Sequence, residues 1–101
     1  MQDIDVSELR DKLERGDRFV FIDVREPYEY EEFNLGAHLI PLGSLQDNLV
    51  NLQPYRDEEI ILHCKSGGRS GHAKLMMESA GFTRVRNLTG GVLEWLRIYG
   101  R

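Results

Sequence analysis

Two short runs of consecutive apolar residues limit the folds open to this chain more than any other feature. One run is residues 19–22 in "RFVFIDV", and the other is residues 60–62 in "EEIILHC". Neither run alternates apolar with polar residues, and this continuity is typical of strands covered on both faces of a parallel sheet. Two shorter strands are expected in "GAHLIP", residues 36–41, and in "VRNL", residues 85–88.

Helical patterns fill the segments between these strands. Apolar residues recur at helical spacing in residues 6–15, 44–52, 69–80 and 92–99, and Pro27 begins a short acidic helical turn. Asp5 and Ser44 stand where they could cap two of these helices. Because strands and helices alternate, we expect a single α/β domain over residues 1–101, with a mostly parallel sheet and helices on both faces.

Composition narrows the classes of partner. The 13 Lys and Arg residues are scattered among 17 acidic residues and the net charge is -4, which argues against nucleic acid or an anionic membrane as the general partner. No apolar run approaches the ~20 residues of a membrane span, and the start "MQDIDVSELR" lacks signal-peptide features, so the cytoplasm is the expected location. The single cysteine, Cys64, excludes an internal disulfide, and no Cys and His pair has zinc-ligand spacing. We therefore expect neither a metal nor a cofactor.

Cys64 stands where the second apolar strand ends. In open α/β sheets, ligands bind beyond the carboxyl ends of the strands, and residues 23–25, "DVR", end the first apolar strand. Arg69 is expected to begin a helix, and Ser70 to hydrogen bond to the sulfur or to cap that helix. Strand alternation points His63 away from Cys64. Two strand ends and one helix N-terminus should thus face the same crevice.

The loop that follows Cys64, "KSGGRS", has the composition of a holder for an anionic sulfur. Gly67 and Gly68 can take positive φ and turn successive backbone N–H groups toward one point. Lys65, Arg69 and the helix N-terminus add positive charge. A thiol in such a place has its pKa lowered from ~8.5 to ~3.5–7.5, so most of it is thiolate at neutral pH.

Two chemistries use such a nucleophile: phosphoryl transfer through a cysteinyl-phosphate, and sulfur transfer through a persulfide. The stretch resembles the cysteine-dependent phosphatases, but these have five residues between Cys and Arg, whereas only residues 65–68 separate Cys64 from Arg69. The smaller ring of amides suits a terminal sulfur atom better than a tetrahedral phosphate. Asp23 and Glu29 are the candidates for a phosphatase general acid.

Three ordered motifs resemble the successive signatures of the rhodanese family over nearly the whole chain: "FIDVREPYEYEEFNLGAHLIPL", "ILHCKSGGRSGHAKLMMESAGF" and "VRNLTGGVLEW". The resemblance implies a five-stranded, mostly parallel sheet and a six-residue active-site loop, Cys64 to Arg69, that carries sulfur on its cysteine. It also implies that the loop amides hold the persulfide, while Asp23 and Arg25 support the loop. The stretch "NLGAHLIPL" is similar to rhodanese domains fused behind adenylating enzymes that supply sulfur to ubiquitin-like carrier proteins.

The function that follows is sulfur transfer by double displacement, with Cys64 as the nucleophile. The expected substrate-binding residues are Lys65, Ser66, Gly67, Gly68, Arg69 and Ser70. The expected donor is thiosulfate-like or a protein persulfide, and the acceptor is cyanide in vitro and a thiol or protein in the cell. Two alternatives stay open: a relay module that passes sulfur between proteins with little small-molecule turnover, and the phosphatase that the spacing disfavours.

Overall fold

A four-stranded parallel sheet forms the centre of the structure, a computed structural model that describes residues 1–101. Its strands are β1 (Val20–Asp23), β2 (His38–Leu39), β3 (Ile60–His63) and β4 (Val85–Asn87), in the order β2-β1-β3-β4. The register pairs Phe21 of β1 with Ile61 of β3. All four expected strands are therefore present, and the prediction of a parallel α/β fold is confirmed.

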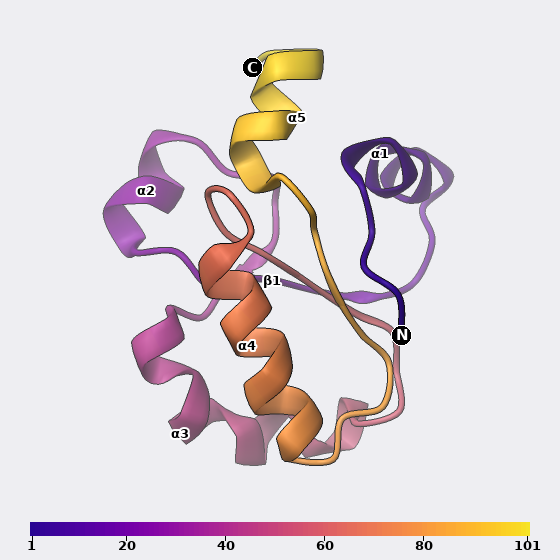
Figure 1. Ribbon diagram of the computed structural model, residues 1–101, viewed down its shortest axis with the longest axis vertical. Helices are drawn as coiled ribbons and strands as arrows, with labels where there is room; N and C mark the ends of the chain where they lie inside the picture. Colours follow the sequence, from indigo (N-terminus) through magenta and orange to yellow (C-terminus); the bar gives the residue numbers. More distant parts are fainter.

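Five α-helices and a short 3-10 turn accompany the strands (Figure 1); three of the helices and the turn connect strands, one helix precedes the first strand and one follows the last. The helices are α1 (Val6–Arg15), α2 (Pro27–Glu32), α3 (Leu42–Leu52), α4 (Gly68–Ser79) and α5 (Gly91–Tyr99), and the turn is η1 (Gln53–Tyr55). Apolar residues of α3 and α4 pack on one face of the sheet, and those of α1 and α5 pack on the other. No helix has both the length and the apolar character needed to cross a membrane.

The sheet has the four strands that the sequence patterns predict, whereas the rhodanese resemblance implied five. In place of a fifth strand, Ile4 makes a single parallel bridge to Leu88, beside the end of β4. The Ile4 N–H donates to Asn87 at 3.0 Å, and the Ile4 carbonyl accepts from Thr89 at 2.8 Å. Pairing stops there because the next residue, Asp5, already caps α1.

The central strand β3 is buried on both faces, as its continuous apolar run predicts. Ile60 and Leu62 belong to the larger core cluster, with α3 and α4. Ile61 belongs to the smaller cluster, with α1 and the edge of α5. The strand can be apolar throughout because neither of its faces meets water.

Of the two predicted helix caps, one is confirmed and the other is wrong. The Asp5 carboxylate accepts the Glu8 N–H at 2.8 Å and caps α1, as expected. The prediction that Ser44 caps α3 is wrong, since the helix begins at Leu42. The Leu42 N–H donates to the carbonyl of Val24 at 3.0 Å, and this contact with the end of β1 starts the helix earlier than the local sequence indicates.

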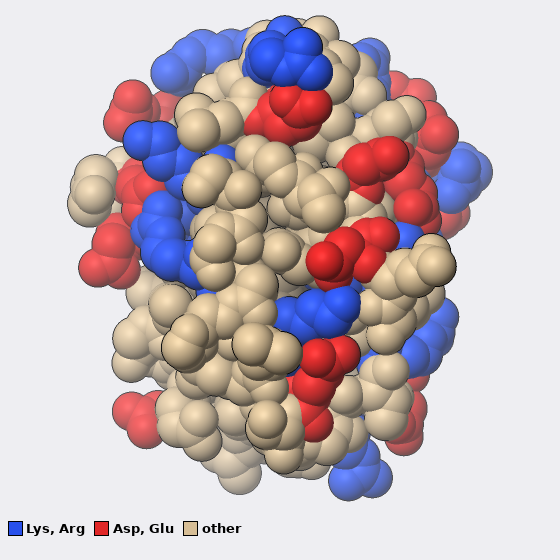
Figure 2. All heavy atoms as spheres, in the orientation of Figure 1, with Lys and Arg blue, Asp and Glu red and all other residues tan.

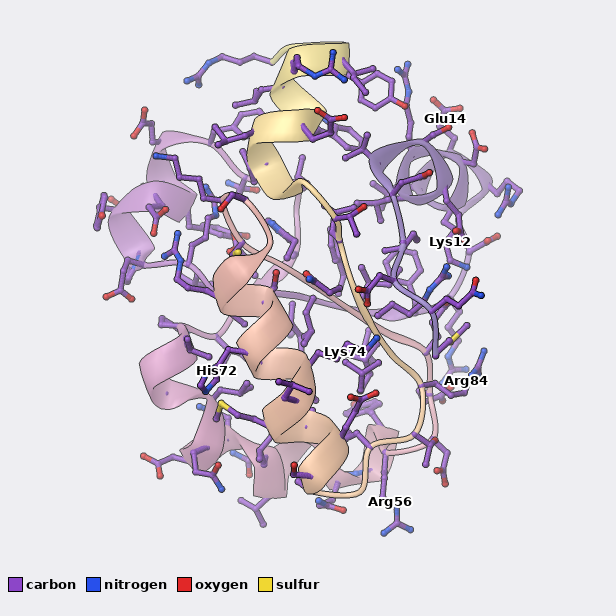
Figure 3. The ribbon with its side chains drawn as sticks, viewed as in Figure 1. Lys12, Glu14, Arg56, His72, Lys74 and Arg84 are labelled. Carbon is purple, nitrogen blue, oxygen red and sulfur yellow. The ribbon has the colours of Figure 1, made fainter.

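Charged groups of both signs are mixed across the surface. Figure 2 shows basic and acidic side chains close to one another on the face that it draws, including near its middle. One of the cations, Lys74 of α4, points toward the N-terminal segment (Figure 3), where its ammonium lies 2.8 Å from the carboxylate of Asp3. This contact ties the first residues of the chain to α4.

Candidate active site

The loop that carries Cys64 lies between α2 and α5 (Figure 1). Cys64 directly follows β3, and α4 begins four residues later at Gly68. The first amides of α5 hold the loop, because the Val92 N–H donates to the Cys64 carbonyl and the Leu93 N–H donates to the Lys65 carbonyl, each at 3.0 Å. The cysteine therefore stands at the carboxyl edge of the sheet, where the sequence predicts a ligand site.

The Cys64 sulfur accepts hydrogen bonds from the loop and from the start of α4. The Gly67 N–H lies 3.1 Å from Sγ, the Ser70 N–H lies 3.4 Å away, and the Ser70 hydroxyl lies 3.3 Å away. Only 1% of the cysteine is exposed. These hydrogen-bond donors around the Cys64 sulfur stabilise a negative charge on it.

Burial and hydrogen bonding act in opposite directions on the pKa of Cys64. Burial raises the pKa, while hydrogen bonds from the Ser70 hydroxyl and from the N–H groups of Ser70, Gly67 and Ser66 lower it. The net effect is a pKa below the ordinary value of a thiol. The geometry thus favours the thiolate, the nucleophilic form of cysteine.

The two loop glycines behave differently. Gly67 has φ +106°, in the region that favours glycine, whereas Gly68 has no positive φ and forms the first residue of α4. The Asn87 side chain holds this bend, because its Nδ2 donates to the Gly67 carbonyl at 3.1 Å and its Oδ1 accepts from the Ser70 hydroxyl. Asn87 was not predicted as a site residue. Its position at the end of β4, which pairs with β3, could have indicated that it lies near Cys64.

Asp23 and Arg25 form a buried ion pair under the site. The Arg25 guanidinium donates to both oxygens of Asp23 at 2.8–3.1 Å, and its backbone N–H donates to the same carboxylate at 2.9 Å. The guanidinium also donates to the Phe33 carbonyl at 2.7 Å. The pair therefore links the end of β1 to the segment after α2.

His63 points away from Cys64, as strand alternation predicts. Its ring stacks at a tilt on Phe21, with 5.3 Å between ring centroids, and its Nε2 lies 3.6 Å from the Asp23 carboxylate. Burial lowers the pKa of His63, which outweighs the opposite effect of Asp23. The histidine is therefore neutral at physiological pH and lies outside the group of residues that contacts the sulfur.

Arg69 pairs with α2 and makes no hydrogen bond to the sulfur. Its guanidinium donates to both carboxylate oxygens of Glu29, at 2.7 and 2.9 Å. This hydrogen bonding holds the pKa of Glu29 at about 2. Glu29 is thus fully ionised and cannot serve as a general acid. The partner lies 40 residues away in the chain, so no local pattern could have indicated the pair.

A cavity of about 240 Å³ opens between α2, the loop and α5. Its lining residues are Arg25, Tyr28, Glu29, Glu32, Phe33, Lys65, Val92, Leu93, Leu96 and Arg101. Lys65 contributes an ammonium that makes no ion pair, and the exposed Ser66 lies next to it in the loop. Of the loop residues 64–69, only Lys65 lines this cavity.

No metal centre is built into this region. No group of three or more His, Cys, Asp or Glu side chains lies together in a way that could hold a metal ion. His72 is exposed on α4, where Figure 3 shows it beside α3. The chemistry that the geometry offers is that of a hydrogen-bonded thiolate.

Comparison with known proteins gives one family match over most of the chain. Residues 5–98 match the family described as "Rhodanese-like domain". A probable adenylyltransferase/sulfurtransferase, MoeZ of Mycobacterium tuberculosis, is 35% identical over 91 residues, which are 89% of this chain and 23% of that protein. The chain thus spans about a quarter of that relative's length.

Two further proteins match over nearly their full length. A sulfurtransferase of Allochromatium vinosum is 28% identical over 103 residues, covering 96% of this chain and 90% of the relative. The solved structure of the human single-domain sulfurtransferase TSTD1 superposes with a TM-score of 0.81 at 27% identity, covering 94% of this chain and 95% of that one. The likeness therefore extends to proteins of similar size.

Proposed function

Because this chain belongs to the rhodanese-like domain family, we propose that it is a sulfurtransferase that carries the transferred sulfur on Cys64. The donor is thiosulfate-like or a protein persulfide, and the acceptor is cyanide in vitro and a thiol or protein in the cell. The reaction takes place in the cytoplasm, where reducing conditions keep a lone cysteine available as a thiol. Lys65, Ser66, Gly67, Gly68, Arg69 and Ser70 form the surroundings of the bound sulfur.

In the first half of the reaction, the Cys64 thiolate attacks the outer sulfur of the donor. The new Sγ–S bond forms as the donor's own S–S bond breaks, and the remainder leaves with the electron pair, as sulfite when the donor is thiosulfate. The product is a persulfide on Cys64. The N–H groups of Gly67 and Ser70 remain aimed at the sulfur and stabilise its negative charge, as an oxyanion hole stabilises oxygen.

In the second half, the acceptor attacks the outer sulfur of the persulfide. With cyanide, a carbon–sulfur bond forms, the persulfide S–S bond breaks, and thiocyanate leaves while the Cys64 thiolate is restored. Two easier displacements replace one difficult step, so ping-pong kinetics are expected. Asp23 and Arg25 act only as positioning residues, because their side chains bind each other.

The observation that carries the proposal is the set of three hydrogen bonds to the Cys64 sulfur. To test it, the reduced protein is incubated with thiosulfate, freed of excess reagent, and weighed by intact mass spectrometry before and after cyanide is added. The wild type should gain one sulfur atom and lose it to cyanide, while Cys64→Ser gains none. Sulfur uptake by Cys64→Ser equal to that of the wild type would refute the proposal.

A relay module is the second candidate, and the relative MoeZ supports it, because there a domain of this kind forms part of a larger protein. In this role Cys64 accepts sulfur from one protein and passes it to another. Rapid exchange of persulfide with a cysteine desulfurase, together with thiosulfate:cyanide turnover near background, would favour the relay. Phosphatase activity is disfavoured by the short loop and by the ionised Glu29.

A further inference from the structure

Asn87 contacts both residues that donate hydrogen bonds to the Cys64 sulfur. It is the last residue of β4, the strand that pairs with β3. Its Nδ2 donates to the Gly67 carbonyl at 3.1 Å, and its Oδ1 accepts the Ser70 hydroxyl at 2.5 Å. Gly67 and Ser70 in turn donate to the sulfur. Asn87 therefore acts on the reacting atom through its neighbours and makes no hydrogen bond to it.

The two contacts of the Asn87 amide fix its orientation. The Gly67 carbonyl can only accept a hydrogen bond, so the NH₂ group of the amide faces it. The amide oxygen Oδ1 then faces Ser70, and because Oδ1 has no proton, the Ser70 hydroxyl is the donor. The one proton of this hydroxyl thus points to Asn87 whenever the contact between them is made.

The backbone of Asn87 is held on both sides. Its N–H donates to the Asp3 carboxylate at 2.9 Å, and its carbonyl accepts the Ile4 N–H at 3.0 Å. The same carboxylate lies 2.8 Å from the ammonium of Lys74, which points toward the N-terminal segment (Figure 3). These contacts keep the Asn87 amide beside Ser70 while the hydroxyl proton turns.

The Ser70 hydroxyl needs an acceptor within the protein, because Ser70 is fully buried. An unpaired buried hydroxyl is unfavourable, and two acceptors lie within reach: Sγ of Cys64 at 3.3 Å and Oδ1 of Asn87 at 2.5 Å. A thiolate is a strong acceptor, whereas an uncharged sulfur is a weak one. Loss of the charge on Sγ therefore favours Asn87 as the acceptor.

Sγ carries no charge in two states of Cys64. One is the thiol, and the other is the persulfide, in which any negative charge lies on the outer sulfur. We propose that the Ser70 hydroxyl donates to Sγ in the thiolate and to Asn87 in these two states, so that Asn87 is a positioning residue for both of them. No proton is transferred, since only the direction of one O–H bond changes. The persulfide part of this proposal rests on the proposed sulfurtransferase function.

No charged side chain takes part in this exchange. Charged or titratable groups approach Cys64 and Asn87 from the N-terminal segment (Asp3), β1 (Asp23 and Arg25), β3 (His63), the loop (Lys65) and α4 (Arg69 and Lys74). Burial keeps His63 neutral, and Arg69 and Lys74 are each paired with a carboxylate. All these groups are unchanged in the variants below, so a changed titration of Cys64 reports the hydrogen bonds.

The test is a double-mutant cycle of Asn87→Ala and Ser70→Ala, and it measures the half-thiolate pH, at which half of Cys64 is thiolate. The ultraviolet absorbance of the thiolate gives this value for Cys64 alone, because the chain has no other cysteine. In Asn87→Ala the hydroxyl keeps only the sulfur as acceptor, which favours the thiolate. The shift caused by Asn87→Ala should be about 0.5–1 pH unit lower when Ser70 is present than in Ser70→Ala.

The cycle also removes the effect of the second contact of Asn87. The hydrogen bond to Gly67 is lost both with and without the Ser70 hydroxyl, so its effect cancels. Asn51→Ala removes the same side chain from an exposed position of α3 and should leave the half-thiolate pH unchanged. An equal shift with and without Ser70, or a difference toward higher pH, would overturn the inference.

Should Asn87→Ala not fold, Asn87→Asp takes its place in the same cycle. The carboxylate is a stronger acceptor than the amide oxygen and draws the hydroxyl proton away from the sulfur. The half-thiolate pH should therefore rise more when Ser70 is present than in Ser70→Ala, where only the added charge acts. An equal rise in the two cases would contradict the role of Asn87.

Sulfur loading tests the persulfide state. The ratio of loaded to unloaded protein is measured by intact mass after equilibration with a fixed mixture of thiosulfate and sulfite, at a pH where Cys64 is fully thiolate. Cys64 takes the outer sulfur of thiosulfate, and sulfite leaves with the electron pair. Asn87→Ala should lower the ratio about threefold or more, because the buried hydroxyl then lacks a good acceptor in the persulfide. The same substitution in Ser70→Ala should not lower it, and an unchanged ratio in Asn87→Ala would refute the role in the persulfide.

The two measurements separate this inference from the proposed function. If thiosulfate loads no sulfur on the wild type, the sulfurtransferase proposal fails, while the titration still decides whether Asn87 accepts from the hydroxyl in the thiol. If the wild type is loaded but the cycle shows no coupling between Asn87 and Ser70, only the role of Asn87 fails.

Discussion

The hydroxyl of Ser70 lies 3.3 Å from the Cys64 sulfur and its backbone N–H lies 3.4 Å away, so one residue supplies two of the three hydrogen bonds to the sulfur. Ser70 is the third residue of α4 and is fully buried. The same hydroxyl also contacts Oδ1 of Asn87, although it has only one proton to donate. The Cys64 sulfur and the Asn87 oxygen therefore compete for that proton.

Replacing Ser70 by alanine should raise the pKa of Cys64. The substitution removes the largest of the hydrogen-bonding effects that lower this pKa and leaves the opposing effect of burial in place. Sulfur uptake should then need a more alkaline pH, and its rate at neutral pH should fall about tenfold or more. The ultraviolet absorbance of the thiolate, followed against pH, gives the midpoint directly.

Ser66→Ala is the matched control for Ser70→Ala. Ser66 is exposed and acts on the sulfur only through its backbone N–H, which alanine keeps. In Ser66→Ala, the pH at which half of Cys64 is thiolate should therefore equal the wild-type value. A midpoint in Ser70→Ala at or below that of Ser66→Ala would show that the hydroxyl does not stabilise the thiolate.

Asp23→Asn should destabilise the domain far more than loss of an exposed carboxylate. The substitution leaves the guanidinium of Arg25 buried with no negative partner, a change that costs about 3–5 kcal/mol of unfolding free energy. Asp17→Asn, which weakens surface pairs with Arg15 and Lys12, should cost no more than about 1 kcal/mol. Urea unfolding of both variants measures the difference, and similar costs would contradict the structural role of the buried pair.

Predictions from the sequence succeeded for the elements whose structure depends on neighbouring residues. The buried strand β3 was predicted because it is apolar on both faces, and the loop after it because Cys64 follows the strand directly. The position of Asp5 as a helix cap depends on its neighbours alone. Each of these features depends on a few neighbouring residues, so it can be predicted from the sequence alone.

The contacts that shape the site come from distant parts of the chain. Glu29 meets Arg69 across 40 residues, and Asn87 meets Ser70 across 17. Each partner is an ordinary polar residue whose local sequence fits a solvated surface equally well. The start of α3 was misplaced for the same reason, because a backbone contact between Leu42 and Val24 decides it. Such pairs become visible only after the sheet sets the order of its strands.

Gly91→Ala should disturb the support of the loop from α5. A Cβ at this position would lie 2.5 Å from the Lys65 carbonyl oxygen and 2.6 Å from that of Cys64. Because backbone atoms form both contacts, the helix start must shift and weaken its hydrogen bonds to the loop. We expect a loss of about 2–4 kcal/mol in unfolding free energy and slower sulfur uptake.

The control for this substitution is Gly16→Ala. Gly16 also has a positive φ, +71°, but an added Cβ would meet nothing within 4 Å. Gly16→Ala should lower the unfolding free energy by only about 1–2 kcal/mol, because of the left-handed backbone strain, and should leave sulfur uptake unchanged. Equal effects of the two variants on uptake would show that the close approach of Gly91 to the loop has no functional consequence.

The pair between Glu29 and Arg69 should make the stability of the domain sensitive to acid. Hydrogen bonds from Arg69 lower the pKa of Glu29 from 4.5 to about 2, so the native state favours its ionised form. A lowered carboxyl pKa contributes stability that is complete above about pH 4.5 and is lost as the pH falls toward 2. With allowance for the partly exposed guanidinium, this contribution is about 1–3 kcal/mol.

Glu29→Gln has no carboxyl group to titrate at this position and should lack this part of the acid sensitivity. Urea unfolding at neutral pH and at about pH 3 should show a smaller loss of unfolding free energy in Glu29→Gln than in wild type. Glu14→Gln, which removes an exposed helical pair with Arg10, should lose as much as wild type. Because all three proteins share their other carboxylates, the comparison isolates Glu29. Equal losses in wild type and Glu29→Gln would mean that the bidentate pair does not persist in solution.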